Sequence, residues 1–185
     1  MYSKEQIDKI GNTIVFLASN IEHASKTKIL KLLYILDEFA IRQTGIPFLN
    51  LEYRIWKFGP VVQDIYIDLT SDLSLLKDYI VKQNNEHGHC YIHPKNSFCD
   101  DEFSDKDIEI LGLVVDEFKD YTPTQLIEYT HRESSLWYKI AKENGVLDQL
   151  LEEKLNCTDI KIDMSELIKY DSTKLSIYNS IKEFC

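Results

Sequence analysis

The segment from Ser25 to Gly45 constrains the fold of this chain more than any other part of the sequence. Its apolar residues recur around most of a helical circumference and not along a single stripe; they are Ile29, Leu30, Leu32, Leu33, Leu36, Phe39 and Ala40. A helix that is apolar on most sides is buried by other elements. Gly45 is a typical helix-stop residue. We therefore predict a central helix over about residues 25–44.

Amphipathic helices are predicted on both sides of this segment. Ser3 with Gln6 forms a capping box ahead of apolar residues at helical spacing, so a helix begins there. Ser104 with Asp107 marks another start, and the helix continues to Phe118. A third start is the run Thr122-Pro123-Thr124-Gln125, followed by a break at residues 133–135 and a stop at Gly145. One or two helices after Ser165 complete the helical part.

Strand signals are few. Two β-prone runs flank turn-forming residues 84–88, which predicts one β-hairpin over about residues 79–93. The alternating stretch "DIKID" predicts a short edge strand over about residues 159–163. The fold class expected from these elements is α+β, mainly α.

The stretch "WKFGPVVQDIY" contains Gly59-Pro60 between apolar residues. Proline is tolerated in the first turn of a helix, where its missing N–H costs nothing. We therefore expect a helix that opens at Pro60 and ends near Thr70, with another helical turn or two beginning at Ser71.

Composition favours a folded protein, and its acidic charge is explained either by solubility alone or by attraction of a basic protein partner. A length of 185 residues suits one domain, and the formal net charge is −10. An acidic surface repels phosphate backbones, so nucleic acid is an unlikely partner for the chain alone. The first ten residues lack the apolar core of a signal peptide and no later stretch is as apolar as a membrane span, so we expect a cytoplasmic protein that does not bind membranes. The four cysteines lack a CxxC spacing and are expected as free thiols.

Three lysines at the start of the central segment oppose the helix dipole: Lys26, Lys28 and Lys31. One interpretation is pairing with nearby acids such as Glu22. The other is a small basic patch that meets an acidic feature of a partner, with Lys28 as a candidate contact residue.

Catalytic and metal-binding motifs are weak. His87, His89 and His93 accompany Cys90, and these side chains are zinc ligands, but their spacing matches neither a zinc finger nor HExxH. A polar hairpin tip explains the same residues. His131 is either a base or a helix-end residue bonded to the backbone. With no nucleophile or nucleotide-binding motif, we predict that the protein is not an enzyme and needs no cofactor.

Two blocks of residues are similar to a known family. The first block contains Lys31, Leu32, Leu33, Tyr34, Asp37, Gly45, Pro47, Tyr53, Trp56, Gly59, Pro60, Val61 and Tyr66, and the second contains Leu126, Thr130, His131, Glu133 and Trp137. In order and spacing they resemble the Panacea domain, also called the SocA-like or phage-associated GepA-like antitoxin domain. The resemblance spans roughly residues 5–145. We expect a Panacea-like domain over residues 1–145 and a C-terminal strand and helix extension over 146–185, packed on the same domain.

The resemblance implies the antitoxin of a bacterial or phage toxin–antitoxin pair. Its partner would be a cognate toxin, and a toxin with a basic surface would be attracted by the acidic charge of this chain. The signature residues would shape the scaffold. Candidate binding anchors are Tyr170, Tyr178 and Phe184, for which core packing is the alternative. Other functions left open are an adaptor that delivers a partner to a protease, a metal-dependent enzyme and, least favoured, a DNA-reading autoregulator.

Overall fold

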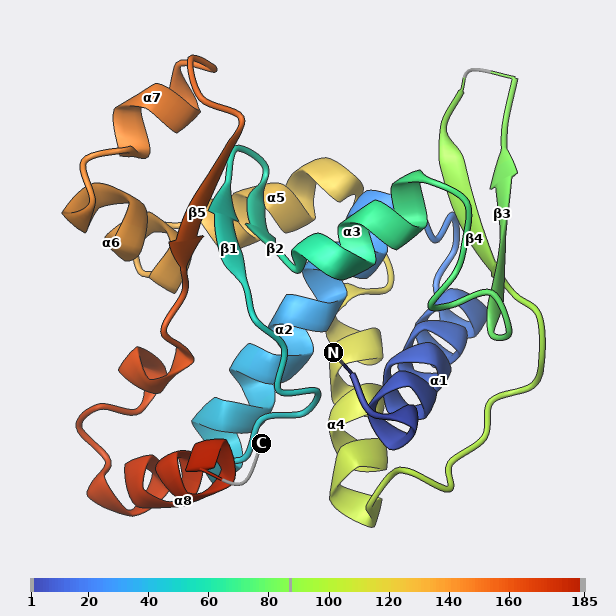
Figure 1. The fold of residues 1–185 in the computed structure, drawn as a ribbon, viewed down its shortest axis with the longest axis horizontal. Coiled ribbons are helices and arrows are strands. Elements are labelled where there is room, and N and C mark those ends of the chain that lie inside the picture. The colour runs from blue at the N-terminus through green and yellow to red at the C-terminus, as the bar shows by residue number, and fades with distance from the viewer. Residues whose placement is uncertain (1, 87, 184–185) are drawn as a thin grey trace. The chain divides into compact units, whose positions relative to one another are not determined.

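The computed structural model describes residues 2–86 and 88–183 (Figure 1). The chain forms two compact units. The first unit comprises Met1–Leu32 and Gln63–Leu126, and the second comprises Leu33–Val62 and Ile127–Cys185. Each unit is therefore built from two separate stretches of the chain. In the described part of the chain, no helix is both long enough and apolar enough to cross a membrane.

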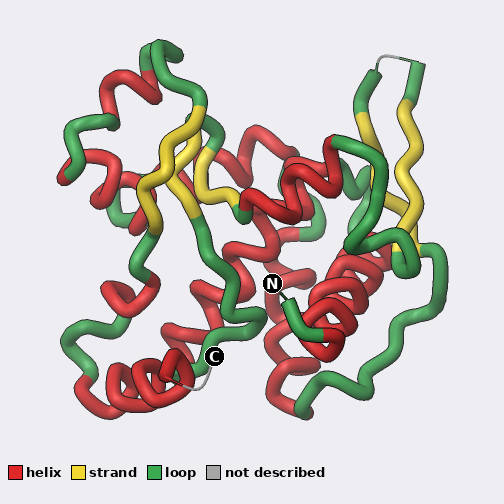
Figure 2. Tube along the Cα trace, in the orientation of Figure 1, coloured by secondary structure: helices red, strands yellow, loops and turns green. Residues whose placement is uncertain are grey.

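Helices make up most of both units, as Figure 2 shows in red. They are α1 (Lys4–Asn20), α2 (Lys26–Thr44), α3 (Gln63–Thr70), α4 (Asp105–Phe118), α5 (Pro123–His131), α6 (Leu136–Glu143), α7 (Leu147–Leu151), α8 (Ser172–Glu183) and the 3-10 helix η1 (Met164–Leu167). Residues 28–38 of α2 are all buried, because this helix is apolar on most sides. The predicted fold class, α+β and mainly α with a central helix, is confirmed.

The helix starts agree with the capping chemistry read from the sequence. Helix α1 opens with the reciprocal Ser3 and Gln6 bonds of a capping box, and α4 opens with those of Ser104 and Asp107. At α5 the Gln125 side chain accepts from the Thr122 N–H at 2.8 Å, and the Thr122 hydroxyl accepts from the Gln125 N–H at 3.2 Å. These bonds confirm the three predicted helix starts. The starts could be predicted because a capping box joins residues only three positions apart.

The predicted hairpin of the first unit is also confirmed. Strands β3 (Ile80–Asn84) and β4 (Cys90–Pro94) pair antiparallel, and both contact α1. Tyr79, at the start of the hairpin, packs its ring on Gly11 of α1, where a Cβ atom would lie 2.3 Å from the ring. The Tyr79 hydroxyl donates to Asp8. A glycine in mid-helix thus permits the hairpin to lie directly on α1.

The predicted helical turn at Ser71 is wrong. Residues 71–79 form bends and turns, and the side chain of Asp68 organises them. Its carboxylate accepts from the backbone N–H groups of residues 74, 75 and 76 at 2.8–3.0 Å. Those bonds satisfy backbone donors that a helix would have used internally, so the loop needs no helical turn.

The second unit contains a three-stranded antiparallel sheet in the order β2-β1-β5 (Figure 2, yellow). Its strands are β1 (Arg54–Trp56), β2 (Gly59–Val61) and β5 (Cys157–Lys161). Strand β5 overlaps the predicted edge strand at 159–163 and does lie at an edge. Helix α6 packs on β1, and α7 and η1 pack on α6.

The prediction that Pro60 opens a helix is wrong. Gly59 and Pro60 belong to β2, which forms a two-residue hairpin with β1 through Lys57 and Phe58, and α3 begins only at Gln63. Gly59 has a φ of 102°, which glycine adopts without steric cost. Pro60 faces Ile55 on an edge strand, where a missing N–H is tolerated.

The C-terminal helix α8 docks on the end of α2. Gly45 has a φ of 78°, and a Cβ atom there would lie 2.7 Å from the carbonyl oxygen of Lys174. The Lys174 ammonium donates to the Arg42 carbonyl at 2.7 Å, and Tyr178 is buried. Gly45 therefore ends α2 and also allows close contact with α8.

Candidate functional site

Asp37 of α2 organises the loop that leads into β1. Its Oδ1 accepts from the N–H groups of Leu49 at 2.7 Å and Asn50 at 3.2 Å, and its Oδ2 accepts from Leu51 at 3.3 Å. The Tyr53 hydroxyl donates to Oδ2 at 2.7 Å. Burial raises the pKa of Asp37, while these four donors act in the opposite direction. The carboxylate is fully engaged inside the protein and holds this loop against α2.

Glu38 is the centre of a second buried polar group in the second unit. Its Oε1 accepts from Arg42 at 2.9 Å and from Arg132 at 3.0 Å, although only 3% of Glu38 is exposed. The neighbouring Tyr34 packs edge-on against Tyr53 at 5.1 Å between ring centroids. Burial, together with the Glu38 carboxylate, raises the pKa of Tyr34 well above its usual value. The phenol therefore stays neutral.

His131 and Trp137 meet beside the sheet of the second unit. Their rings stack at 3.8 Å with an interplanar angle of 13°. The Trp137 Nε1–H donates to the carbonyl of Trp56 at 2.9 Å, and the Trp56 Nε1–H donates to the Thr158 carbonyl at 3.2 Å. Thr130 is fully buried. These contacts tie α6, β1 and β5 together, and they place His131 in packing against an indole.

The remaining signature residues are buried or half-buried. Leu33, Gly59, Pro60 and Val61 are buried, and the half-buried Tyr66 lies under the ammonium of Lys26 at 4.8 Å. Lys31 is 2% exposed, and burial lowers its pKa to about 7.

Lys28 bonds to two backbone carbonyls in the first unit. Its ammonium donates to the Glu22 carbonyl at 3.0 Å and to the Lys119 carbonyl at 3.4 Å. Burial lowers the pKa of Lys28, while the carboxylates of Asp120 and Glu22 act in the opposite direction. Lys28 is only 5% exposed, so its ammonium joins two loops of the unit and offers little outer surface.

The hairpin histidines form no metal centre among residues 2–86 and 88–183. No three His, Cys, Asp or Glu side chains in these ranges are close enough to hold an ion. His89 precedes β4 and the exposed His93 lies within it. His87 lies outside the described residues.

Family comparison gives the decisive observation about this scaffold. A model of the antitoxin SocA-like Panacea domain matches residues 29–138. The chain belongs to the Panacea family. Comparisons with curated proteins and with solved structures find no match. The matched range contains both signature blocks and ends directly after Trp137.

The three aromatic candidates lie C-terminal to the Panacea match. Tyr170, between η1 and α8, is 94% exposed. Tyr178 of α8 is only 6% exposed, so it does not meet the condition of exposure that a binding anchor requires. It faces inward because it lies on the side of the amphipathic helix that docks on its unit. Phe184 lies outside the described residues.

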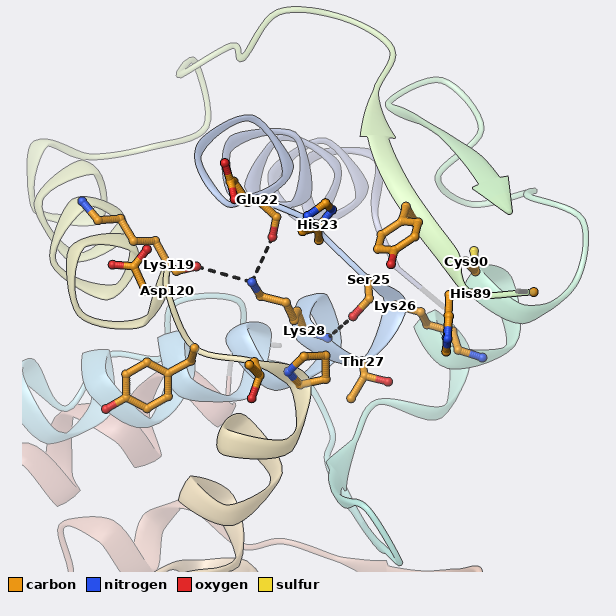
Figure 3. A pocket seen from close by; sticks show the side chains of 15 residues that line it. Glu22, His23, Ser25, Lys26, Thr27, Lys28, His89, Cys90, Lys119 and Asp120 are labelled. Atoms are coloured by element: carbon orange, nitrogen blue, oxygen red, sulfur yellow. Dashed lines mark hydrogen bonds between the residues drawn. The ribbon is translucent and has the colours of Figure 1, made fainter. Parts of the chain in front are cut away.

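A cavity in the first unit of the Panacea protein was not foreseen from the sequence. It has a volume of about 700 Å³ and is lined by residues 22–23, 25–28, 88–91 and 119–123 (Figure 3). We call it the β4 cavity. No sequence motif marks it, because its walls come from three segments far apart in the chain.

Proposed function

We propose that the protein is an antitoxin that neutralises a cognate toxin by direct protein–protein binding and that it acts without catalysing a reaction. The observation that carries the proposal is the Panacea match over residues 29–138. The signature residues of that match serve as scaffold, since Asp37, Trp137 and Thr130 are buried and bonded or packed inside their unit. Binding then falls to surfaces that the signature does not include.

Charge supports a basic toxin as the partner. The chain carries 31 acidic and 21 basic side chains, for a net charge of −10. A field of that sign accelerates encounter with a positively charged protein and disfavours acidic competitors. The exposed aromatic Tyr170 is the anchor we propose for the second unit, because buried aromatic side chains supply much of the affinity at interfaces.

The test is co-expression in a bacterial host. We expect the product of the gene adjacent to this one to arrest growth when expressed alone, and co-expression of this protein to restore growth. The two proteins should then co-purify. A harmless neighbouring product would contradict the proposal, and so would toxicity that persists with no complex.

Neutralisation by occlusion is separated from delivery to a protease by the level of the toxin. Under occlusion the toxin accumulates, inactive, in the complex. Under delivery its half-life shortens when this protein is present and recovers in a protease-deficient host. If this protein restores growth only when the proteases are active, delivery to a protease, and not occlusion, is the mechanism.

A further inference from the structure

Strand β5 forms one edge of the three-stranded sheet in the second unit (Figure 2). Within the described part of the chain, β1 is its single neighbour in that sheet. An edge strand carries backbone N–H and C=O groups with which a further strand can pair, and charged side chains commonly prevent this. The direction of these backbone groups and the signs of the charges along β5 therefore determine what can bind there.

The two ends of β5 direct their backbone groups away from β1. The N–H of Ile162, just after β5, donates to the Tyr53 carbonyl at 2.8 Å. The carbonyl of Asn156, just before β5, accepts from the N–H that follows β1 at 2.9 Å. Both flanking residues thus face β1. Bonding directions alternate along an antiparallel strand, so Cys157 and Lys161 face outward.

The middle of β5 keeps this alternation, although its pairing with β1 is irregular there. The Thr158 carbonyl accepts from the Trp56 indole at 3.2 Å, and the Thr158 hydroxyl donates to the Ile55 carbonyl at 2.7 Å. The Ile160 N–H donates to the same hydroxyl at 3.2 Å. Residues 158 and 160 therefore both turn toward β1, so the backbone groups of Asp159 face outward.

The outward edge of β5 is open. The side chains of Asp159 and Lys161 are 97% and 63% exposed, and Cys157 is exposed as well. Across residues 2–86 and 88–183, no segment other than β1 forms backbone hydrogen bonds with Asp159 or Lys161. A strand from outside the chain can therefore pair with this edge.

Opposite charges alternate along the exposed face of β5. Lys161 lies directly opposite Arg54 of β1, and two cations in such positions repel each other. Arg54 pairs with Asp159, and Lys161 pairs with Glu52, each at 2.5 Å. Each pair includes a side chain that is more than half exposed, so each contributes little. The open side of Lys161 therefore favours a carboxylate, and the open side of Asp159 favours an ammonium.

A second copy of β5 supplies both groups in one antiparallel register. With Ile160 opposite its own copy, Asp159 faces Lys161 of the second copy, and Lys161 faces Asp159 of the second copy. These outward residues exchange backbone hydrogen bonds. The half-buried Ile160 side chains then meet on the other face of the sheet.

The neighbouring registers are unfavourable. Outward residues must face outward residues for the strands to bond, so the next registers in either direction are centred on Asp159 or on Lys161. The first places Asp159 opposite Asp159 of the second copy, and the other places Lys161 opposite Lys161. Like charges directly opposite each other destabilise a strand pair. The charges of β5 therefore select the register centred on Ile160.

We propose that the chain forms a symmetric dimer in which β5 pairs antiparallel with β5 of a second copy, with Ile160 on the two-fold axis. The sheets of the two copies join into one. Because the paired strands are short and the net charge of −10 opposes association, we expect a dissociation constant on the order of 100 µM. This dimer goes beyond the antitoxin function and does not depend on it.

Sedimentation equilibrium of the full chain, from about 5 µM to about 1 mM, tests the proposal. We expect a monomer–dimer equilibrium, with concentration-dependent amide shifts at residues 157–163 in NMR spectra of the ¹⁵N-labelled chain. A chain that stays monomeric over this range overturns the proposal, and this is the result expected if the edge accepts only a strand of another protein. A dimer whose amide shifts lie only outside residues 157–163 overturns it as well.

Asp159→Lys tests the register through its charges. The variant places lysine opposite Lys161 of the second copy and should raise the dissociation constant about tenfold or more. It also reduces the net negative charge, so association without a specific register would become tighter. The double variant Asp159→Lys with Lys161→Asp restores opposite charges in the same register and should recover the dimer. A double variant that dimerises no better than the single one would contradict the proposed register.

Lys161→Asp has a matched control in Lys154→Asp. The two lysine side chains are 63% and 69% exposed, each pairs with a glutamate, and the two substitutions change the net charge equally. Lys161→Asp alone should weaken the dimer about tenfold or more. Equal weakening by both would show that net charge, and not the pairing of β5, controls association, and would overturn the proposal.

Discussion

The hydroxyl of Tyr53 donates to the carboxylate of Asp37 at 2.7 Å, at a position where only 1% of Asp37 is exposed. The same carboxylate accepts from three successive backbone N–H groups. One side chain of α2 thereby holds the whole loop that precedes β1. Both residues belong to the Panacea signature, which gives that signature a physical role in the scaffold.

Replacing Asp37 should cost more stability than replacing its side-chain partner. Asp37→Ala leaves three backbone N–H groups unpaired, two of them buried, and we expect a loss of about 3 kcal/mol or more in the free energy of unfolding. Tyr53→Phe removes one hydrogen bond and should cost about 1–2 kcal/mol. Urea unfolding measures both. Equal losses would contradict the central role of the carboxylate.

Gly45→Ala should loosen the C-terminal helix. The new Cβ would collide with the Lys174 backbone, and alanine disfavours the φ of 78°. We expect a loss of about 2 kcal/mol and faster amide hydrogen exchange in α8.

Gly112→Ala is the matched control for that substitution. Gly112 lies within α4, and no atom lies within 4 Å of the position that a Cβ would take there. Alanine should therefore stabilise the helix by about 0.5–1 kcal/mol. If both glycine variants behave alike, the close contact between Gly45 and Lys174 does not hold the helix in place.

Lys31 should make stability depend on pH above neutrality. Its pKa is about 7 in the folded chain against 10.5 for the ordinary side chain. Between these two pH values the unfolded chain binds more protons than the folded chain. The free energy of unfolding therefore increases as the pH rises from 7 and decreases as the pH falls back towards 7. From pH 7 to pH 9 the gain is about 2 kcal/mol.

Lys31→Met isolates that contribution. The variant removes the titrating group and keeps an unbranched chain in the core. Unfolding midpoints at pH 7 and pH 9 should differ less in the variant than in the natural chain. An unchanged difference would show that Lys31 does not titrate in this range.

Tyr170→Ala should affect binding and not folding. With 94% of Tyr170 exposed, we expect the free energy of unfolding to change by less than about 0.5 kcal/mol. Affinity for the toxin should fall about tenfold or more if this ring is an anchor. Leu113→Ala, at an exposed position of α4, is the comparison variant and should leave affinity unchanged. Calorimetric titration with the toxin measures the affinity of both variants.

The sequence predicts local structure well because local structure depends on residues close in the chain. Ser3 with Gln6 and Thr122 with Gln125 satisfy helix ends within three positions. The hairpin at β3 and β4 depends on a turn between two β-prone runs. Each of these elements is present where the pattern placed it.

Features that depend on distant residues could not be predicted in the same way. Strand β1 pairs with β5 about a hundred positions later, as in Arg54 with Lys161, and no local signal identifies that partner. Gly59-Pro60 is compatible with a helix start and with a hairpin at a sheet edge. Only the pairing of β1 with β2 in the folded unit distinguishes the two. The β4 cavity joins three separate segments, so it becomes visible only in the folded unit.

The most direct test of direct neutralisation uses purified components. The purified toxin is assayed for the activity by which it arrests growth, and this protein is titrated into the assay without protease. We predict that the toxin activity is fully inhibited near one molar equivalent and that the two proteins elute together on size exclusion. Undiminished toxin activity at a large molar excess of folded antitoxin would contradict the account.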